Sequence, residues 1–354
     1  MVLASADLVP YRLPLTETVV WNGERSDARK GLLLRIGDIE GRVGWGDAAP
    51  LPGFSRETPA EAEDALRTVG AALVGRAVEP CDLLPGGSVA AVLDAAEVAP
   101  SARFALDLAL ADLAAQDLGR TLPQALHPDP EVTLPLNGLV MGTGDAAIEA
   151  ARQLADAGYA AVKLKVGRQP VEADLDLVRA VREALPASVA LRLDANRAWA
   201  WDQAVAFAEG AAGAALDYVE EPLAEPARMP ELWHDTGLPL AVDETLQAPG
   251  GEAAIRGWAE AAVLKPTLLG GVTRTLALAA AARSVGVRPV LSAAFESGVG
   301  LRGVAALAAA TGGEPAGLDT YRWLAADVLP PLPLRQPRVD VPALFAAPLD
   351  VRVP

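Results

Sequence analysis

The chain has 354 residues, of which 46 are acidic and 30 basic, so its formal net charge is −16 and its isoelectric point is near 4.6. This acidity excludes non-specific nucleic-acid binding, and no lysine- and arginine-rich run provides a local exception. The single cysteine, Cys81, excludes an internal disulfide and any cysteine-rich metal centre.

The composition is that of a globular protein, since 51% of the residues are hydrophobic and 21% are charged. The first fifteen residues, MVLASADLVPYRLPL, lack a basic start followed by an apolar core. No uninterrupted apolar stretch of about 18 residues occurs elsewhere. We therefore expect neither export nor a membrane partner, and a cytoplasmic enzyme is the default interpretation.

The first hundred residues predict an α+β unit. Residues 8–15 and 31–45 have the pattern of strands, the second set with a turn at Gly37-Asp38. Alanine-rich sequence predicts helices from about Pro59 to Leu73 and from about Pro100 to Leu118.

From about residue 132 the pattern changes, because short apolar segments alternate with alanine-rich helical sequence. Eight strand candidates follow one another: VTLPLNGLV, AAVKLKV, VALRLDAN, LDYVEEP, LPLAVDE, AAVLKP, RPVLSAA and a weaker AGLDT. This alternation favours a parallel (β/α) barrel over an open doubly wound sheet. The glycine-dense segments at 270–271 and 298–300 are too short for a dinucleotide-binding G-x-G-x-x-G.

Polar residues occur where these strands end, which is where barrel enzymes carry their chemistry. They are Lys163, Lys165, Asp194, Asn196, Glu220, Glu221, Asp243, Glu244, Lys265 and Ser292. Taken singly, the acidic ones could be turn or cap residues. Lys265 is harder to explain in that way, because it ends the apolar run AAVL and should point into the barrel or its mouth.

The spacing of three acids and a lysine argues for one shared site. The steps from Asp194 to Glu220, to Asp243 and to Lys265 are 26, 23 and 22 residues, each about one βα unit. Three carboxylates that lie side by side at a barrel mouth need a cation, and oxygen ligands suit Mg²⁺. Zinc is disfavoured, since neither histidine, His127 or His234, lies at a strand end.

The lysines give the site a reaction class. Lys165 and Lys265 should lie across the barrel from each other, and desolvation with neighbouring positive charge should lower a lysine pKa enough for it to act as a base. A metal beside such a base suits removal of a proton α to a carboxylate. Serine-nucleophile hydrolysis lacks a histidine partner here, and a Schiff-base aldolase would not need three acids.

These motifs resemble the muconate lactonizing enzyme subgroup of the enolase superfamily. The subgroup is marked by K-x-K on the second strand, acids ending strands three to five and a lysine on the sixth, matched here by Lys163-Leu-Lys165, Asp194, Glu220, Asp243 and Lys265. The resemblance covers nearly the whole chain and implies a (β/α)7β barrel over 101–320, an α+β capping domain over 1–100, and a tail over 321–354 that returns to the capping domain.

Within the subgroup the stretches GWGDAAPLPGFSRET, LRLDANRAW, VEEP, VLKPTLLGG and LSAAFESGVG resemble one dehydratase branch. That branch converts 2-succinyl-6-hydroxy-2,4-cyclohexadiene-1-carboxylate to an aromatic acid in menaquinone biosynthesis. The resemblance therefore implies a hydro-lyase that acts on a small carboxylate.

The resemblance also implies a role for each residue. Asp194, Glu220 and Asp243 would bind Mg²⁺, with Mn²⁺ as an alternative; strand parity alone leaves the choice between Glu220 and Glu221 open, and the family pattern selects Glu220. Lys165 would be the base and then the acid, Lys265 would stabilise the enediolate, and Lys163 would pair with the substrate carboxylate.

The substrate pocket is less strongly implied. Arg192 and Asn196 would be pocket or supporting residues, Ser292 and Gly317 would meet the succinyl group, and the loop around Trp21 to Lys30 would close over the site. Where some relatives have a run of three serines, this chain has Ser292-Ala293-Ala294.

Other functions remain open at this stage. An N-acylamino-acid racemase or dipeptide epimerase would use Lys165 and Lys265 as bases on opposite faces of the α-carbon, and a cycloisomerase or another acid dehydratase would use the same groups. A non-catalytic Mg²⁺- and carboxylate-binding protein would tolerate loss of a ligand or lysine, and none is lost. The oligomeric state is not indicated.

Overall fold

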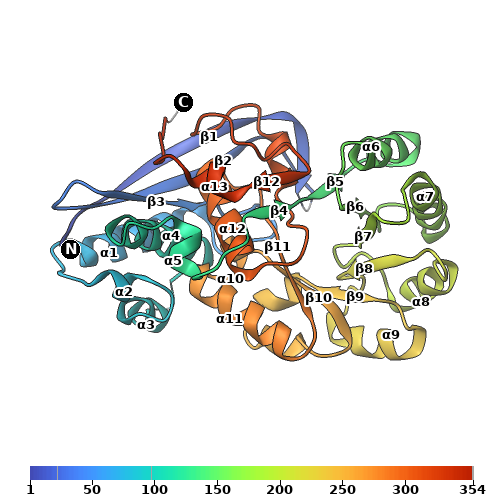
Figure 1. Cartoon of the computed structure of the whole chain (residues 1–354). Coiled ribbons are helices and arrows are strands. Elements are labelled where there is room, and N and C mark those ends of the chain that lie inside the picture. Colours follow the sequence, from blue (N-terminus) through green and yellow to red (C-terminus); the bar gives the residue numbers. More distant parts are fainter. Residues whose placement is uncertain (22, 97, 353–354) are drawn as a thin grey trace.

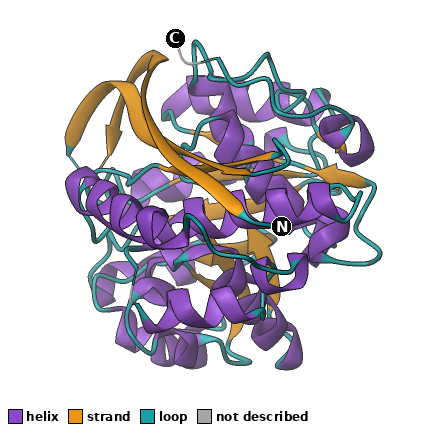
Figure 2. Ribbon diagram, turned by 90° about the vertical axis from the view of Figure 1, so that its left-hand side faces the viewer, coloured by secondary structure: helices purple, strands orange, loops and turns teal. Residues whose placement is uncertain are grey.

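The structure of the chain is a computed structural model that describes residues 1–21, 23–96 and 98–352. Its N-terminal part is a three-stranded antiparallel sheet, which we call the cap sheet, in the order β1 (Leu3–Trp21), β2 (Glu24–Asp38) and β3 (Val43–Ala48). β1 and β2 extend beyond the predicted strands because their pairing continues to Trp21 opposite Glu24. In Figure 2, β1 starts at the N label and sweeps over the helices toward the upper left.

Helices α1 and α4 pack against the cap sheet. The helices of this part of the chain are α1 (Pro59–Leu73), α2 (Pro80–Leu83), α3 (Ser88–Ala95), α4 (Pro100–Asp117) and α5 (Leu122–Leu126). α1 begins where predicted because Thr58 and Glu61 form a capping box and Pro59 occupies the first turn.

α4 is buried along most of its length. Its backbone lies so close to β3 that a Cβ on Gly46 would be 1.9 Å from the carbonyl oxygen of Ala105. This contact explains the GWG sequence, since only glycine permits such an approach.

A seven-stranded parallel sheet lies at the centre of the second part of the chain (Figure 1). Its strands are β5 (Asn137–Val140), β6 (Ala161–Lys165), β7 (Ala190–Asp194), β8 (Leu216–Glu220), β9 (Leu240–Val242), β10 (Ala259–Leu264) and β11 (Arg288–Leu291). Neighbours in sequence are neighbours in the sheet, as expected for a barrel. Small and aromatic side chains fill its interior: Tyr218, Ala241, Ala261, Val263 and Val290.

The eighth predicted strand, AGLDT, is reduced to two bridges. Ala316 pairs with Leu136, and Gly317 pairs with Ser292, both in parallel. These residues therefore lie between β11 and the start of β5 and complete a (β/α)7β barrel. The strand is short because Asp319–Trp323 turns into a 3₁₀ helix directly afterwards.

Helices follow most of the strands and surround the sheet (Figure 1). They are α6 (Gly144–Asp156), α7 (Val171–Ala184), α8 (Trp201–Gly210), α9 (Met229–Thr236), α10 (Pro266–Leu269), α11 (Gly271–Ser284) and α12 (Gly298–Thr311). α6 and α7 bury apolar residues that recur three or four positions apart, such as Ala147, Ala151 and Leu154 of α6, which is the amphipathic pattern of a helix.

The C-terminal segment contacts both parts of the chain. The backbone nitrogen of Ala325 donates to the carbonyl of Pro14 on β1 at 2.9 Å, and Leu324 forms an antiparallel β-bridge with Leu15. Further on, β12 (Arg338–Asp340) pairs with β4 (Thr133–Pro135) at the start of the barrel, and α13 (Val341–Phe345) follows. The predicted domain boundaries near residues 100 and 320 stay predictions, because α4 and this segment each contact both parts.

Among the helices of the described residues, none is both long and apolar enough to cross a membrane. The cytoplasmic location stays a prediction from the sequence.

Candidate active site

One large cavity of about 1080 Å³ opens at the carboxyl ends of the barrel strands, between the barrel and the cap sheet. The cap contributes Trp21, Leu51, Gly53 and Phe54 to its wall. The barrel contributes Asn137, Leu139, Lys163, Lys165, Asp194, Asn196, Arg197, Glu244, Lys265, Ser292, Ala293, Ala294, Phe295, Gly317, Thr320 and Trp323. The position agrees with the rule that barrel chemistry gathers at this end.

Strand register brings the polar side chains of β6, β7 and β8 into one layer. Lys165 is the Cα partner of Asp194, and Asp194 is the partner of Glu220. Alternate residues of a strand share a face, so Lys163 and Lys165 both point into the barrel. The repulsion between their ammonium groups is offset by the carboxylates opposite.

Each lysine contacts at least one carboxylate. Lys163 Nζ lies 2.6 Å from Glu220 Oε2 and 2.9 Å from Asp194 Oδ2. Lys165 Nζ lies 2.7 Å from Asp194 Oδ2 and 2.8 Å from Asn196 Oδ1. Lys265 contacts Asp243 and lies 3.8 Å from Glu220 Oε1.

These ion pairs are removed from solvent. Asp194 and Glu220 are 0% exposed and Asp243 is 2% exposed. Moving these charges out of water costs free energy, and pairing them often does no more than offset that cost. A buried cluster of charges in a cavity is therefore a candidate for function rather than a source of stability.

The three lysines differ in pKa because their surroundings differ. Burial lowers the pKa of Lys165, and the positive charges of Lys163 and Lys265 lower it further against the attraction of Asp194. This confirms the predicted direction for the proposed base.

Burial also disfavours the charged forms of the other two lysines, but their carboxylate partners outweigh it. The pKa of Lys163 is raised by Asp194 and Glu220, and that of Lys265 by Asp243 and Glu220. A raised pKa at Lys265 fits the expectation that this lysine acts by its charge, since it faces acids more directly than it faces other ammonium groups.

Composition carries a signal for these residues that the spacing argument did not use. The chain has only four lysines, Lys30, Lys163, Lys165 and Lys265, and its other basic side chains are arginines. Three of the four line the cavity. An arginine stays charged at any ordinary pH, whereas a buried lysine can lose its proton. Most of the lysines of this chain therefore lie in the cavity, where a basic side chain that can lose its proton could transfer one.

Glu220 and Glu221, which strand parity could not separate, point to different places. Glu221 accepts hydrogen bonds from the backbone nitrogens of Asp243 (2.9 Å) and Thr245 (2.8 Å). It also accepts from Thr245 Oγ1 and from Arg197 Nε, each at 2.9 Å. Both oxygens of Glu221 thus accept two hydrogen bonds each from Arg197 and the residues that follow β9. Glu220, in contrast, contacts Lys163 and Lys265.

The donor set of Asp194, Glu220 and Asp243 fits a hard divalent cation. Glu220 Oε1 is buried without a hydrogen-bond partner. Burial raises the pKa of Asp243, and the neighbouring Glu244 and Glu220 raise it further against Lys265. A bound cation would relieve both costs. Within the described residues no group of three acidic, cysteine or histidine side chains has ready metal-binding geometry, and here the carboxylates contact lysines instead.

The remaining predicted pocket residues divide into two groups. Asn196, Ser292 and Gly317 line the cavity. A Cβ on Gly317 would lie 2.5 Å from Ser292 Oγ, so glycine is needed for the serine hydroxyl to take its place.

Arg192 does not line the cavity, which corrects the prediction that it binds substrate. It donates to Asp217 (2.8 Å) and Glu314 (2.9 Å), and its guanidinium lies 5.1 Å from the ring centre of Tyr218. It is the Cα partner of Lys163, which does line the cavity, so the difference lies in the direction of its side chain, which reaches Asp217 and Glu314 instead of the lysine cluster.

The predicted closing loop, residues 21–30, is mostly the β1–β2 hairpin and the start of β2. Trp21 and Gly23 line the cavity, and Asn22 lies outside the described residues.

Sequence reasoning gave no role to several other cavity residues. Glu244 accepts a hydrogen bond from Asn196 Nδ2 at 2.9 Å, which continues the chain of contacts from Lys165. Asn137 and Thr320 each have a buried side-chain oxygen without a partner. Asn137 could have been found from strand alternation, since it shares the inward face of the first barrel strand with Leu139; Thr320 follows a strand too short to show a pattern.

Comparison with known families matches both parts of the chain. The family described as "MenC, N-terminal domain" matches residues 3–113, and the family described as "Enolase C-terminal domain-like" matches residues 146–345. The o-succinylbenzoate synthase of Edwardsiella ictaluri (strain 93-146) is 34% identical over 331 residues, which are 92% of this chain and 93% of the relative. That of Pectobacterium atrosepticum is 32% identical over 349 residues, 97% of each chain.

Solved structures share the fold at lower identity. The muconate lactonizing enzyme from Pseudomonas fluorescens, complexed with muconolactone, superposes with a TM-score of 0.87 at 22% identity and covers 99% of this chain and 96% of its own. A dipeptide epimerase from Enterococcus faecalis V583, complexed with Mg and the dipeptide L-Leu-L-Tyr, gives 0.87 at 23% identity, covering 96% of this chain and 97% of its own. The predicted barrel and capping-domain fold is confirmed.

Proposed function

Because the chain belongs to the enolase-like family that carries the MenC N-terminal domain, we propose that it works as an o-succinylbenzoate synthase through the lysine and carboxylate cluster of its cavity. This enzyme is a hydro-lyase of menaquinone biosynthesis that dehydrates 2-succinyl-6-hydroxy-2,4-cyclohexadiene-1-carboxylate to o-succinylbenzoate. The observation that carries the residue assignment is the convergence of Lys163, Lys165 and Lys265 with buried carboxylates at one barrel mouth.

Asp194, Glu220 and Asp243 would hold Mg²⁺. When bound, the cation would supply positive charge beside the substrate carboxylate, where negative charge develops as the α-proton leaves. Support comes from the unpartnered Glu220 oxygen and from the all-oxygen donor set. Mn²⁺ as a substitute stays a prediction.

Lys165 is the proton-transfer group in this proposal. Its neutral Nζ takes the proton from the carbon that bears the carboxylate, and the electron pair of that C–H bond moves into the carboxylate to give an enediolate. The resulting ammonium then gives the proton to the hydroxyl group on the adjacent ring carbon. The C–O bond breaks, water leaves and the ring becomes aromatic. One proton serves both steps, so no external acid is required.

The other two lysines act by charge. Lys265, on β10 across the mouth, stabilises the enediolate from the opposite face, consistent with a raised pKa that keeps it protonated. Lys163 pairs with the substrate carboxylate. Asn196 orients Lys165 through the 2.8 Å contact to its Nζ.

The far end of the substrate needs a different environment. Ser292 and Gly317 lie beside each other on the wall opposite the carboxylates, where the succinyl group would reach. We therefore expect a small carboxylate as the ligand, bound in a cavity whose described wall comes from a single chain.

Racemisation of N-acylamino acids is the competing use of the same groups, because Lys165 and Lys265 face the cavity from β6 and the end of β10. It would require Lys265 to lose its proton and act as a second base, which the dehydration does not require.

The decisive assay compares the purified protein, with Mg²⁺, on the cyclohexadiene acid and on N-succinyl amino acids. We expect dehydration to exceed racemisation in kcat/KM by at least about 100-fold, or roughly 3 kcal/mol of transition-state discrimination. Equal rates would make the enzyme bifunctional, and absence of dehydration would refute the proposal.

A further inference from the structure

A buried arginine of the cap sheet connects two segments of the cavity wall. Arg29 on β2 is 2% exposed. It donates from Nε to the carbonyl of Phe295 and from Nη1 to the carbonyl of Pro50, each at 2.8 Å, and from Nη2 to the carbonyl of Ala49. With a further bond from Nη1 to the carbonyl of Lys30 at 3.2 Å, the planar guanidinium has four acceptors in fixed directions. The segment after Pro50 and the segment ending at Phe295 both line the cavity.

The other two strands of the cap sheet reach the same segment of the barrel. Asp47 on β3 accepts from the backbone nitrogen of Ser297 (2.8 Å) and from its hydroxyl (2.7 Å). Tyr11 on β1 donates to Asp47 at 2.9 Å. Each strand thus provides one buried polar side chain, and we call Tyr11, Arg29 and Asp47 the clasp.

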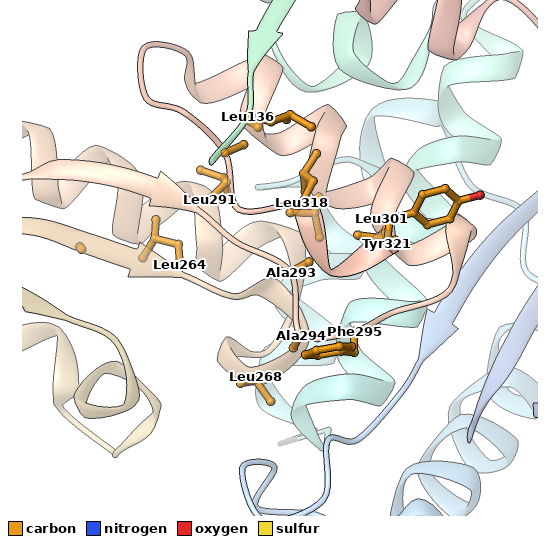
Figure 3. Close-up of a cluster of buried hydrophobic side chains, with 14 of the residues drawn as sticks. Leu136, Leu264, Leu268, Leu291, Ala293, Ala294, Phe295, Leu301, Leu318 and Tyr321 are labelled. Atoms are coloured by element: carbon orange, nitrogen blue, oxygen red, sulfur yellow. The ribbon is translucent and has the colours of Figure 1, made fainter. Parts of the chain in front are cut away.

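The segment held by the clasp is conformationally costly. Phe295 has a φ of +61°, which an aromatic residue adopts only when its surroundings impose it. Its ring packs edge-on against Trp21 (5.3 Å between centres) and Trp323 (6.3 Å). Figure 3 shows Leu291, Ala293, Ala294 and Phe295 following one another from the end of β11, with Phe295 beside Leu268.

Arg29 has the contacts needed to hold this wall in place. Its bond to Phe295 joins residues that are 266 positions apart in the chain, and its guanidinium lies 5.9 Å from the ring centre of Trp21. Removing it would leave buried carbonyls without donors and would free Phe295 to leave the positive-φ conformation. None of the hydrogen bonds and ion pairs described for Lys165 or Lys265 includes Arg29, so the chemical groups would stay where they are.

We propose that Arg29 is a positioning residue for substrate binding. It fixes the wall formed by Leu51, Gly53 and Ala293 to Phe295 in the shape that fits the end of the substrate farthest from the carboxylates of the protein. The inference rests on the proposed dehydratase function. It gives Arg29, whose hydrogen bonds among the described residues all go to main-chain carbonyls, a role in specificity through the wall that it holds.

The test compares Arg29→Met and Arg29→Lys with Arg35→Met. Arg35 lies on the same strand, but its side chain contacts β1, through an ion pair with Asp7 at 3.2 Å and a hydrogen bond to Ser5 at 3.4 Å. Steady-state kinetics on the cyclohexadiene acid should show KM raised about tenfold or more in Arg29→Met with kcat within about threefold, the signature of lost binding and retained chemistry. Arg29→Lys, which keeps the charge and part of the bonding, should lie between, and Arg35→Met should match the unsubstituted protein.

Hydrogen exchange gives a second measurement that needs no substrate. Backbone amides of residues 293–297 should exchange at least about tenfold faster in Arg29→Met and at the original rate in Arg35→Met. An unchanged KM would overturn the inference, whether kcat is also unchanged or falls with the folded fraction, as would unchanged exchange. If the unsubstituted protein fails to dehydrate the acid, the proposed function fails, and the exchange measurement still decides whether Arg29 holds the wall.

Discussion

The two sides of the barrel mouth are built from different kinds of contact. On one side, β6 to β10 present lysines and carboxylates from successive strands in register. On the other, the wall after β11 is held by side chains of the cap sheet that lie hundreds of residues away in sequence. The first side carries charges that do chemistry, and the second carries shape that selects what is bound.

This difference predicts which substitutions should lower the catalytic rate and which should weaken substrate binding. A substitution among the lysines removes a proton carrier or a charge from the transition state. A substitution in the wall moves the surface that the substrate touches and leaves the proton carrier in place.

The largest effect should come from Lys165→Ala. We expect kcat to fall by roughly 10³-fold or more, because general base catalysis alone contributes about 10²- to 10⁴-fold. Mg²⁺ affinity, measured by calorimetry, should stay within about threefold because the lysine is not a ligand. Lys30→Ala, which changes the one lysine outside the cavity, is the matched control and should be fully active; substantial turnover by Lys165→Ala would remove its role as base.

Asp243→Ala should weaken metal binding and activity together. The loss of one carboxylate from the proposed set should lower Mg²⁺ affinity by roughly 100-fold, at the upper end of what the loss of a supporting group alone costs. Calorimetric titration with Mg²⁺ measures it, and Glu260→Ala on the exposed side of β10 is the control. Unchanged affinity would count against the three-carboxylate site.

Glu296→Gln tests the wall through its dependence on pH. Burial raises the pKa of Glu296 from its ordinary value of 4.5 to about 7. Folding therefore favours the protonated carboxyl, so this contribution to stability is fully present below pH 4.5 and is lost as the pH rises through about 7. Glutamine cannot ionise and does not suffer this loss.

The difference in unfolding free energy between Glu296→Gln and the original protein should therefore shift in favour of glutamine by about 3 kcal/mol between pH 4.5 and pH 8. Urea denaturation at the two pH values measures it. A difference that is the same at both would show that Glu296 ionises normally.

The smallest effect should come from Gly317→Ala. The added Cβ would meet Ser292 Oγ at 2.5 Å, so the hydroxyl must rotate away. We expect KM to rise about fivefold, equivalent to roughly 1 kcal/mol of overpacking, with kcat nearly unchanged. Gly257→Ala, where nothing lies within 4 Å, is the control. Equal KM values for the two variants would show that this part of the wall does not meet substrate.

The sequence predicts the charged side of the mouth well because barrel strands recur at regular intervals and alternate residues face inward. Lys163, Lys165, Asp194, Glu220, Asp243 and Lys265 could all be placed from spacing and from the family resemblance. The wall could not be placed in this way. The roles of Arg29 and Asp47 depend on contacts between the cap sheet and residues 295–297, and no local pattern encodes such a pairing.

Arg192 shows the limit within the barrel itself. Its position near a strand end suggested a pocket residue, as is true of its register partner Lys163, but the acids Asp217 and Glu314 draw its guanidinium away from the cavity. Similarly, spacing could not show which acids each lysine contacts, because it gives the strand on which an acid lies and not the distance between its oxygen and a lysine nitrogen.

Replacement of Lys165 and of Lys265 by arginine separates the lysine that carries the proton from the lysine that acts by charge. Arginine keeps the positive charge but cannot act as a base. We predict that Lys165→Arg loses kcat for dehydration by roughly 10³-fold or more, whereas Lys265→Arg stays within about 100-fold of the original enzyme. Equal losses in the two variants, or a Lys165→Arg protein within about tenfold of the original, would contradict the account.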